Sequence, residues 1–128
     1  MFAYLYFRTN PFLELENLCK KGFTERNPFY KNKEYIKHEL EQGHFILIIA
    51  VSVHIVEALN ITLTSYFSHL NASMIDEKYN GGTEFFSIDI IDQVQEYLVS
   101  NYVKHHVLTT EEINKLHEQF LTEENLIK

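Results

Sequence analysis

Basic side chains gather in one short stretch of the chain. Residues 20–37 contain six lysines or arginines and two glutamates, although the formal charge of the whole chain is −7. A glycine among them lets backbone amides approach an anion closely. The predicted phosphate-binding residues are Lys20, Lys21, Gly22, Thr24, Arg26, Lys31 and Lys33. The pattern indicates a phosphate site; the alternative is that exposed lysines keep a turn soluble and protect the edge of a sheet.

Two tyrosines precede this stretch at a spacing of two residues. Residues 2–7 (FAYLYF) are aromatic and aliphatic, a composition that favours a strand. Alternate residues of a strand point to the same face, so we expect Tyr4 and Tyr6 to present two hydroxyl groups to one side. A second strand ending near residues 21–24 would pair with the first, with a bulge or a close approach at Gly22.

Histidine and cysteine give no metal-binding pattern. The chain has seven histidines and one cysteine. The best spacings are His105 and His106 with His117, and His54 with Glu57. Neither matches a ligand arrangement of known geometry. Cys19 cannot form an internal disulfide, and a lone cysteine beside an apolar residue is typically a small buried hydrophobe. We expect no bound metal and a reducing compartment.

Acidic residues dominate the rest of the chain. Residues 43–128 carry twelve aspartates and glutamates against four lysines. The negative total charge argues against a protein that coats nucleic acid without specificity, because such binding needs many phosphate contacts. The acidic residues 76–124 also fit a small inhibitor or immunity-type factor that covers the basic surface of a protein. Nucleic acid and protein are both candidate partners.

The periodicity of apolar residues predicts an α+β fold. Residues 44–53 form a near-continuous apolar run, typical of a strand at the centre of a sheet. The other predicted elements are strand 2–7, a strand ending at 21–24, helix 32–42, helix 55–70, loop 71–82, a short edge strand or extended segment 83–88, a helix capped by Ser87, and helix 109–121 with a Thr109/Glu112 capping box. This order predicts a small three-stranded antiparallel central sheet flanked by helices, with two C-terminal helices.

Length and composition indicate a single core. The chain has 128 residues, of which 45% are hydrophobic, enough for one domain. We divide it into a domain over residues 1–104 and a helical extension over 105–128 that packs on the same domain. The longest apolar run, residues 45–53, is too short to span a bilayer, and the N-terminus lacks the basic region of a signal peptide. We expect an intracellular protein, cytoplasmic or nuclear, that is not secreted and has no membrane partner.

Four segments of the chain match, in order, the motifs of one known family. They are AYLYFRTNP (3–11), KKGFT (20–24), VEALNITLTSYF (56–67) and GTEFF (82–86). Together they resemble the GIY-YIG nuclease superfamily, most closely its phage Orf-type DNA-binding branch. The first two are similar to the branch's Tyr-x-Tyr strand, Asn-Pro turn and Lys-Ile-Gly-x-Thr strand, and the last two resemble the family's second helix and its Glu-Trp-Phe ending. The resemblance covers about residues 3–100 and implies a GIY-YIG-like fold.

The resemblance also implies which positions would do chemistry, and here the chain departs from the family. GIY-YIG enzymes are Mg-dependent phosphodiesterases that use motif tyrosines, an arginine that steadies the phosphate and a helix glutamate that holds the metal. The corresponding positions are Tyr4, Tyr6, Lys31 and Asn60, and the family's helix histidine falls on Thr64. A neutral amide is a poor ligand for Mg²⁺, and lysine lacks the bidentate fork of arginine.

We therefore expect a catalytically degenerate domain, a pseudonuclease that binds nucleic acid or a ribonucleoprotein and needs no cofactor. The small acidic protein-binding factor is the first alternative. The second is an active Mg-dependent endonuclease, for which Mg²⁺ would be required and Glu57, one turn before Asn60, is the nearest substitute ligand.

Overall fold

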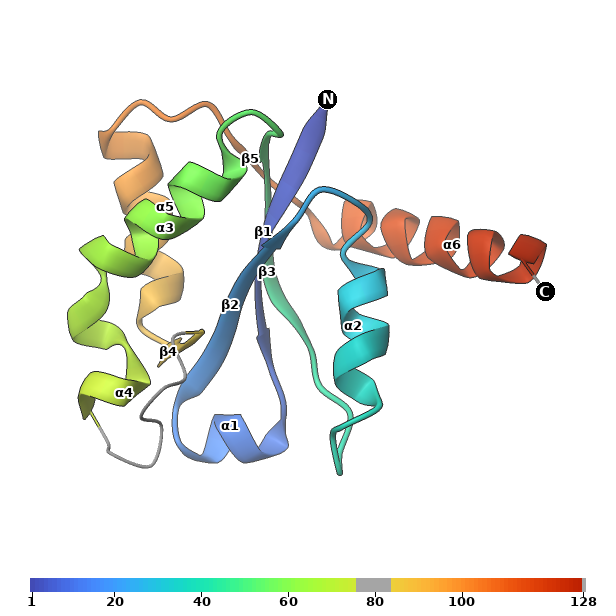
Figure 1. Cartoon of the computed structure of the whole chain (residues 1–128), viewed down its shortest axis with the longest axis horizontal. Coiled ribbons are helices and arrows are strands. Elements are labelled where there is room, and N and C mark those ends of the chain that lie inside the picture. The colour runs from blue at the N-terminus through green and yellow to red at the C-terminus, as the bar shows by residue number, and fades with distance from the viewer. Residues whose placement is uncertain (76–83, 128) are drawn as a thin grey trace.

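Five strands form one antiparallel sheet at the centre of the computed structural model, which describes residues 1–75 and 84–127 (Figure 1). The strands are β1 (Phe2–Thr9), β2 (Leu18–Thr24), β3 (His44–Ser52), β4 (Phe85–Ser87) and β5 (His106–Val107), in the order β4-β2-β1-β3-β5. The helices are α1 (Pro11–Leu15), α2 (Phe29–Ile36), α3 (Val56–Tyr66), the 3₁₀ helix η1 (Ser68–Leu70), α4 (Ala72–Ile75), α5 (Ile90–Ser100) and α6 (Thr110–Ile127). Within the described residues, no helix is both long and apolar enough to cross a bilayer.

The two faces of the sheet are covered by different helices. α3 and α5 lie against one face, and α2 and α6 lie on the other (Figure 1). Alternation along β1 sends Leu5 and Phe7 into the core beneath α3 and α5. The same alternation sends Tyr6 and Arg8 to the opposite side, where both contact α2. The first face is mainly apolar, and the second carries the polar groups of Tyr6 and Arg8.

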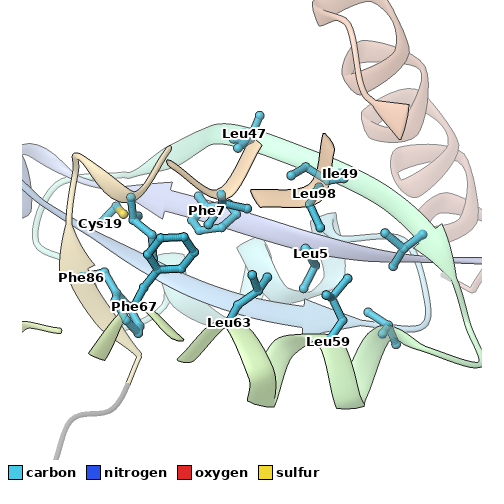
Figure 2. Packing of buried hydrophobic residues seen from close by; sticks show 14 of the residues in the cluster. Leu5, Phe7, Cys19, Leu47, Ile49, Leu59, Leu63, Phe67, Phe86 and Leu98 are labelled. Carbon is cyan, nitrogen blue, oxygen red and sulfur yellow. The ribbon is translucent and has the colours of Figure 1, made fainter. Parts of the chain in front are cut away.

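The apolar core fills the space between the sheet and the α3–α5 pair. It includes Leu5 and Phe7 of β1, Leu47 and Ile49 of β3, Leu59 and Leu63 of α3, Val94 and Leu98 of α5, and Phe67, Cys19 and Phe86 (Figure 2). Each fully buried side chain of this size stabilises the fold by roughly 1.5–3 kcal/mol. The core gives the sheet a rigid backing, so that side chains on its other face are held in place.

The α+β prediction is confirmed, but the sheet has five strands rather than three. The three predicted strands form its centre as β2, β1 and β3, and the predicted edge or extended segment contributes β4. The sequence does not predict β5, because a strand of two residues is too short to show a periodic pattern. Val107 is a strand residue through its pairing with Ile49 of β3.

Two corrections concern the helices beside β1 and β2. The connection between β1 and β2, for which no helix was predicted, contains α1, because Asn10 accepts a hydrogen bond from the backbone amide of Leu13 at 2.9 Å and Pro11 takes the first helical position. α2 covers residues 29–36 rather than 32–42, because the chain leaves the helix in a tight turn after Ile36 and brings Glu39 to the sheet.

The later helices differ less from the prediction. The helix predicted over 55–70 is shorter and continues as η1. Ser87 does not cap α5; its hydroxyl accepts from the backbone amide of Asp89 at 3.3 Å before the helix begins. Of the loop predicted over 71–82, residues 72–75 form α4, and residues 76–82 lie outside the described residues.

The capping box predicted for α6 is confirmed. The backbone amide of Glu112 donates to the hydroxyl of Thr109 at 3.2 Å, and the amide of Thr109 donates to the carboxylate of Glu112 at 3.0 Å. Two backbone donors at the start of α6 are therefore satisfied by the two side chains.

Gly22 is required by a close approach and not by a bulge. The irregularity in the central strands lies between Phe7 and Arg8, opposite β3. Gly22 pairs regularly with Tyr6, whose ring lies across it: a Cβ on Gly22 would be 2.3 Å from the Tyr6 hydroxyl oxygen and 2.5 Å from its Cζ. Because Tyr6 fills this space, the backbone of Gly22 is not open to an anion.

Replacing Gly22 with alanine should lower the free energy of unfolding by about 2 kcal/mol, within the range for overpacking, because the new methyl group meets the Tyr6 ring. Urea denaturation followed by circular dichroism measures this change. In a Tyr6→Leu background, which removes the ring atoms that the new methyl group meets, the same substitution should cost less. Equal costs in the two backgrounds would contradict this explanation of Gly22.

Candidate functional site

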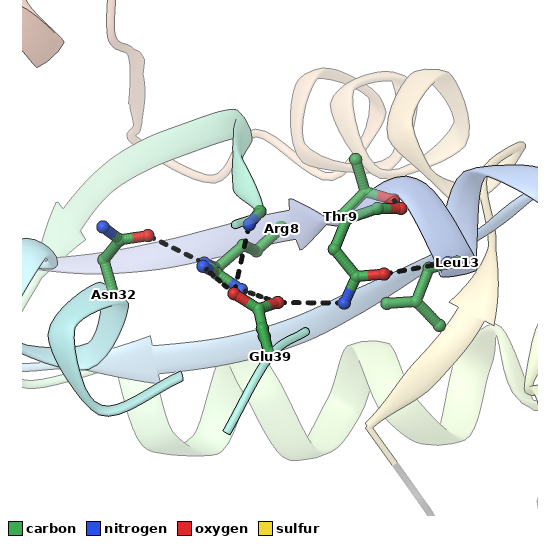
Figure 3. A network of polar contacts seen from close by, with 7 residues as sticks. Arg8, Thr9, Leu13, Asn32 and Glu39 are labelled. Atoms are coloured by element: carbon green, nitrogen blue, oxygen red, sulfur yellow. Dashed lines mark hydrogen bonds and ion pairs between the residues drawn. The ribbon is translucent and has the colours of Figure 1, made fainter. Parts of the chain in front are cut away.

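A buried arginine at the end of β1 organises the α2 side of the sheet (Figure 3). Arg8 is 2% exposed, and its two terminal nitrogens donate to the two carboxylate oxygens of Glu39, each at 2.7 Å. Its Nε donates to the side-chain oxygen of Asn32 at 2.8 Å. A bidentate pair of this kind is stronger and more directional than a single contact. The pair joins β1 to α2 and to the turn that follows α2.

Glu39 accepts two further hydrogen bonds. The side-chain amide of Asn10 donates at 2.9 Å, and the backbone amide of Gly43 donates at 3.1 Å. Burial disfavours the charged carboxylate, but the hydrogen bonds from Arg8, Asn10 and Gly43 outweigh it and lower the pKa of Glu39 to about 2. Glu39 is therefore ionised at neutral pH and ties the α2–β3 connection to the end of β1.

Tyr35 of α2 lies between this ion pair and the surface. Its hydroxyl oxygen is 2.6 Å from that of Tyr6. The guanidinium carbon of Arg8 lies 5.1 Å from the centroid of the Tyr35 ring, and Nζ of Lys20 lies 4.1 Å from the same centroid. Both are cation–π contacts. Burial raises the pKa of Tyr6, and its hydrogen bond with Tyr35 raises it further, so this hydroxyl stays protonated.

A cleft of about 530 Å³ opens beside these side chains. It is lined by Arg8, Asn10, Leu13, Lys20, Glu34, Tyr35, His38, Glu39 and Phe85. Burial lowers the pKa of Lys20; Glu84 and Glu39 oppose this effect, while Arg8 and Lys31 add to it. The ion pair of Lys20 with Glu84 is long, at 4.0 Å. Lys20 therefore faces the cleft with its carboxylate partner at a long distance, which leaves its ammonium group accessible to an anion.

Three of the predicted phosphate-binding residues, Lys33, Arg26 and Thr24, make contacts away from the cleft. Lys33 forms an ion pair with Glu124 of α6 at 2.7 Å. The guanidinium carbon of Arg26 lies 4.0 Å from the ring centroid of Tyr30. Thr24 is buried, and its hydroxyl accepts from the backbone amide of Arg26 at 3.3 Å. The predicted cluster is therefore divided into separate contacts along β2 and α2.

Lys21 points to the face opposite Lys20 and is 4% exposed. Its Nζ donates to Oδ1 of Asn60 at 2.6 Å, to the backbone oxygen of Asn60 at 3.3 Å and to the hydroxyl of Thr64 at 2.8 Å. The three acceptors match the three N–H groups of an ammonium ion. Burial lowers the pKa of Lys21 to about 8. This lysine is part of the packing of α3 on the sheet.

The position of Asn60 does not fit the Mg²⁺ that the GIY-YIG resemblance implies. Its side-chain oxygen already accepts from an ammonium group, which would repel a second cation at close range. Asn60 also lies on α3, across the sheet from Tyr6 and Lys31, so the candidate catalytic positions are not brought together. Among residues 1–75 and 84–127, no group of three His, Cys, Asp or Glu side chains has a geometry that would hold a metal ion.

Tyr4 is separated from the cleft although it shares a face with Tyr6. It lines a different pocket near β5, together with His106 and Glu112. Nε2 of His106 lies 2.8 Å from the carboxylate of Glu112. Burial raises the pKa of Tyr4.

The sequence prediction omits the residues that build the cleft. Arg8, Tyr35 and Glu39 are absent from the predicted set, although Arg8 lies two residues beyond Tyr6 and must share its face. For Glu39 there is no local signal, because its partner is 31 residues away in the sequence.

Comparisons with protein-family models, with curated protein sequences and with solved structures give no match for this chain. The GIY-YIG resemblance therefore rests on the four sequence segments, and the chemistry of the cleft follows from its own geometry.

Replacing Glu39 with glutamine should lower the free energy of unfolding at pH 7 by about 3 kcal/mol, because the buried guanidinium of Arg8 loses its counter-charge. The pKa of Glu39 is about 2 in the folded chain against an ordinary 4.5. Its stabilisation is therefore present above pH 4.5 and lost as the pH falls toward 2. Urea denaturation of the wild type and the variant between pH 4.5 and 2 should show that the difference in their free energies of unfolding becomes smaller as the pH falls. Glu41→Gln, at an exposed position, is the control, and a pH-independent difference would contradict the account.

Lys21→Met should remove a pH dependence of the free energy of unfolding at alkaline pH. The pKa of Lys21 is about 8 in the folded chain and 10.5 ordinarily, so the unfolded chain binds the proton more readily between these values and stability rises with pH. The stability of the wild type minus that of the variant should therefore rise by up to about 3 kcal/mol across this window. Cys19 is present in both chains, so its own titration largely cancels. A flat difference would mean that the Lys21 ammonium carries no burial penalty.

Proposed function

We propose that the domain binds nucleic acid through phosphate groups at the mouth of the cleft and does not cut it. The observation that carries this proposal is the placement of Lys20 and Lys31. Lys20 lines the cleft, and Nζ of Lys31 lies 3.7 Å from a carboxylate oxygen of Glu34, which lines the cleft as well. Two ammonium groups that repel each other are stabilised by a phosphate between them.

The present partners of these two lysines are easily displaced. Lys20 lies 4.0 Å from a carboxylate oxygen of Glu84, and Lys31 lies 3.7 Å from one of Glu34. All four side chains are partly exposed, and exposed ion pairs of this kind contribute only about 0–1 kcal/mol. A phosphate that replaces both carboxylates therefore breaks only weak ion pairs.

Three features support binding without cleavage. Tyr6 is buried with its hydroxyl bonded to Tyr35, and its raised pKa keeps it from supplying a phenolate that would activate water. Asn60 is bonded to the Lys21 ammonium on the other face. Lys31 offers a point charge in place of an arginine fork. Each feature removes one part of the phosphodiesterase chemistry that the resemblance implies.

The fold is compatible with this proposal. We infer that β2, β1 and β3 correspond to the three-stranded sheet of a GIY-YIG-like domain over residues 1–104, with the helical segment 105–128 as an addition. A ribonucleoprotein presents the same phosphates as free nucleic acid and is an equivalent ligand. This function belongs to an intracellular protein.

Fluorescence anisotropy with short labelled DNA and RNA, over a range of salt concentrations, tests the proposal. The chain should bind at low salt and leave the probe intact in Mg²⁺. Lys20→Gln/Lys31→Gln should weaken binding and make the salt dependence on duplex DNA shallower by about 0.9 in log–log slope, since the two lysines share one phosphate and each neutralised phosphate contributes about 0.9. Lys104→Gln/Lys115→Gln removes the same charge at exposed lysines and should change the slope less.

Absence of binding at low salt, or equal effects of the two double variants, would refute a site at the cleft. Cleavage of the probe in Mg²⁺ or Mn²⁺ that Tyr6→Phe abolishes would support the endonuclease alternative instead.

A protein partner is the second candidate, and the outer face of α5 favours it. Asp89, Asp92 and Glu96 are all exposed and fall on one side of the helix. Val99, which follows on the same side, is 66% exposed, and Tyr102, beyond the end of the helix, is 95% exposed. An acidic surface with adjoining apolar area fits the basic surface of another protein.

A pull-down with and without nuclease treatment separates these candidates. If nucleic acid is the ligand, nuclease treatment should release the captured material. The triple variant Asp89→Asn/Asp92→Asn/Glu96→Gln should then capture as much as the wild type. If a protein binds α5, capture should survive the nuclease and fail in this triple variant.

A further inference from the structure

A second hollow, of about 600 Å³, lies between α2 and α6 and shares no lining residue with the cleft. The first turn of α2 touches α6 where the ring of Phe29 stacks on His117, with centroids 4.5 Å apart. Helices that cross make contact over a limited length and then diverge (Figure 1). The other end of α2, with Ile36 and Lys37, is therefore separated from α6 by a groove that reaches the start of β3.

Aromatic rings form the floor of this groove. Phe29 and Phe45 meet edge to face with centroids 5.3 Å apart, and Phe120 lies 6.4 Å from Phe29. Phe29 and Phe120 are 9% and 8% exposed, so the floor is already packed. Ile36 and Ile113 add apolar walls. A hollow of this size with apolar walls is typical of small-molecule sites, and its rings are favourable partners for another flat ring.

The rim of the groove is positively charged on an otherwise acidic protein. Glu124 is the single carboxylate among the lining residues, and it is paired with Lys33 at 2.7 Å. Lys37 is exposed at the same rim and takes part in no ion pair within the described part of the chain. His44 lines the rim as well. Because Lys33 and Glu124 neutralise each other, the net charge of the lining is that of Lys37, which matches a ligand with one anionic group.

We propose that this groove binds a small, flat aromatic monoanion, such as an aromatic carboxylate. The ring lies on the floor formed by Phe29, Phe45 and Phe120, and the anionic group meets the ammonium of Lys37. This site is independent of nucleic-acid binding at the cleft, because Lys33, Ile36 and Lys37 lie on a different side of α2 from the residues that line the cleft.

Isothermal titration with the full chain and three probes tests the class of ligand. 1-Naphthoate should bind with a dissociation constant below about 1 mM, the scale expected for a ligand of this size. The neutral 1-naphthalenemethanol should bind about fivefold more weakly because it lacks the charge. Decanoate, which has the charge without the ring, should also bind more weakly. Decanoate binding as tightly as naphthoate, or no naphthoate binding in this range, would overturn the proposal.

A matched pair of variants on α6 locates the site. Leu121 lines the groove and is 47% exposed, whereas Leu126 is 81% exposed and lies outside the lining. Leu121→Glu should weaken naphthoate binding at least tenfold, because it places a carboxylate beside the ligand, and Leu126→Glu should leave it unchanged. Equal effects would place the ligand elsewhere.

A third variant tests the charge contact and does not depend on packing. Lys37→Gln should weaken naphthoate about fivefold and leave the neutral alcohol unchanged. Thermal unfolding checks that each variant is folded, and if Leu121→Glu unfolds, Lys37→Gln alone decides. Equal loss for both probes, or for neither, would overturn the assignment of Lys37.

Discussion

The buried ion pair between Arg8 and Glu39 determines how the polar side of the sheet is built. Removing two charges from water has a large desolvation cost. Hydrogen bonds offset this cost here: Arg8 donates three, and Glu39 accepts two more from Asn10 and Gly43. The pair joins β1 to α2 and to the turn that follows α2. Tyr35 of α2 then contacts both Arg8 and Lys20 beside the cleft.

The sheet separates neighbouring residues into different environments. Lys20 lies over Tyr35 at an open cleft, while Lys21 is buried against Asn60 and Thr64. The first can exchange its distant carboxylate for a phosphate; the second has all three donors engaged and serves packing. Neighbouring lysines in a strand therefore point to opposite faces and have different roles. In β2, Lys20 is accessible to a ligand and Lys21 is not.

Apolar periodicity predicts the three central strands and the helices that cover the core, because each of these elements buries a continuous stripe. It fails where a boundary depends on a distant side chain: α2 ends where Glu39 turns toward Arg8, and β5 exists only through its pairing with β3. The site was harder to predict than the fold. Grouping charges by proximity in the sequence merges Lys20 with Lys21, and no local pattern links Arg8, Tyr35 and Glu39.

Phosphate binding at the cleft requires Lys20 and Lys31 to contact the same ligand. Lysine side-chain NMR during titration with a short oligonucleotide measures this, because the signal of each Nζ reports on its own contacts. We expect the Lys20 and Lys31 signals to shift together, while those of Lys33, paired with Glu124, and Lys104 stay in place. Shifts confined to other lysines, or equal shifts at all of them, would contradict it.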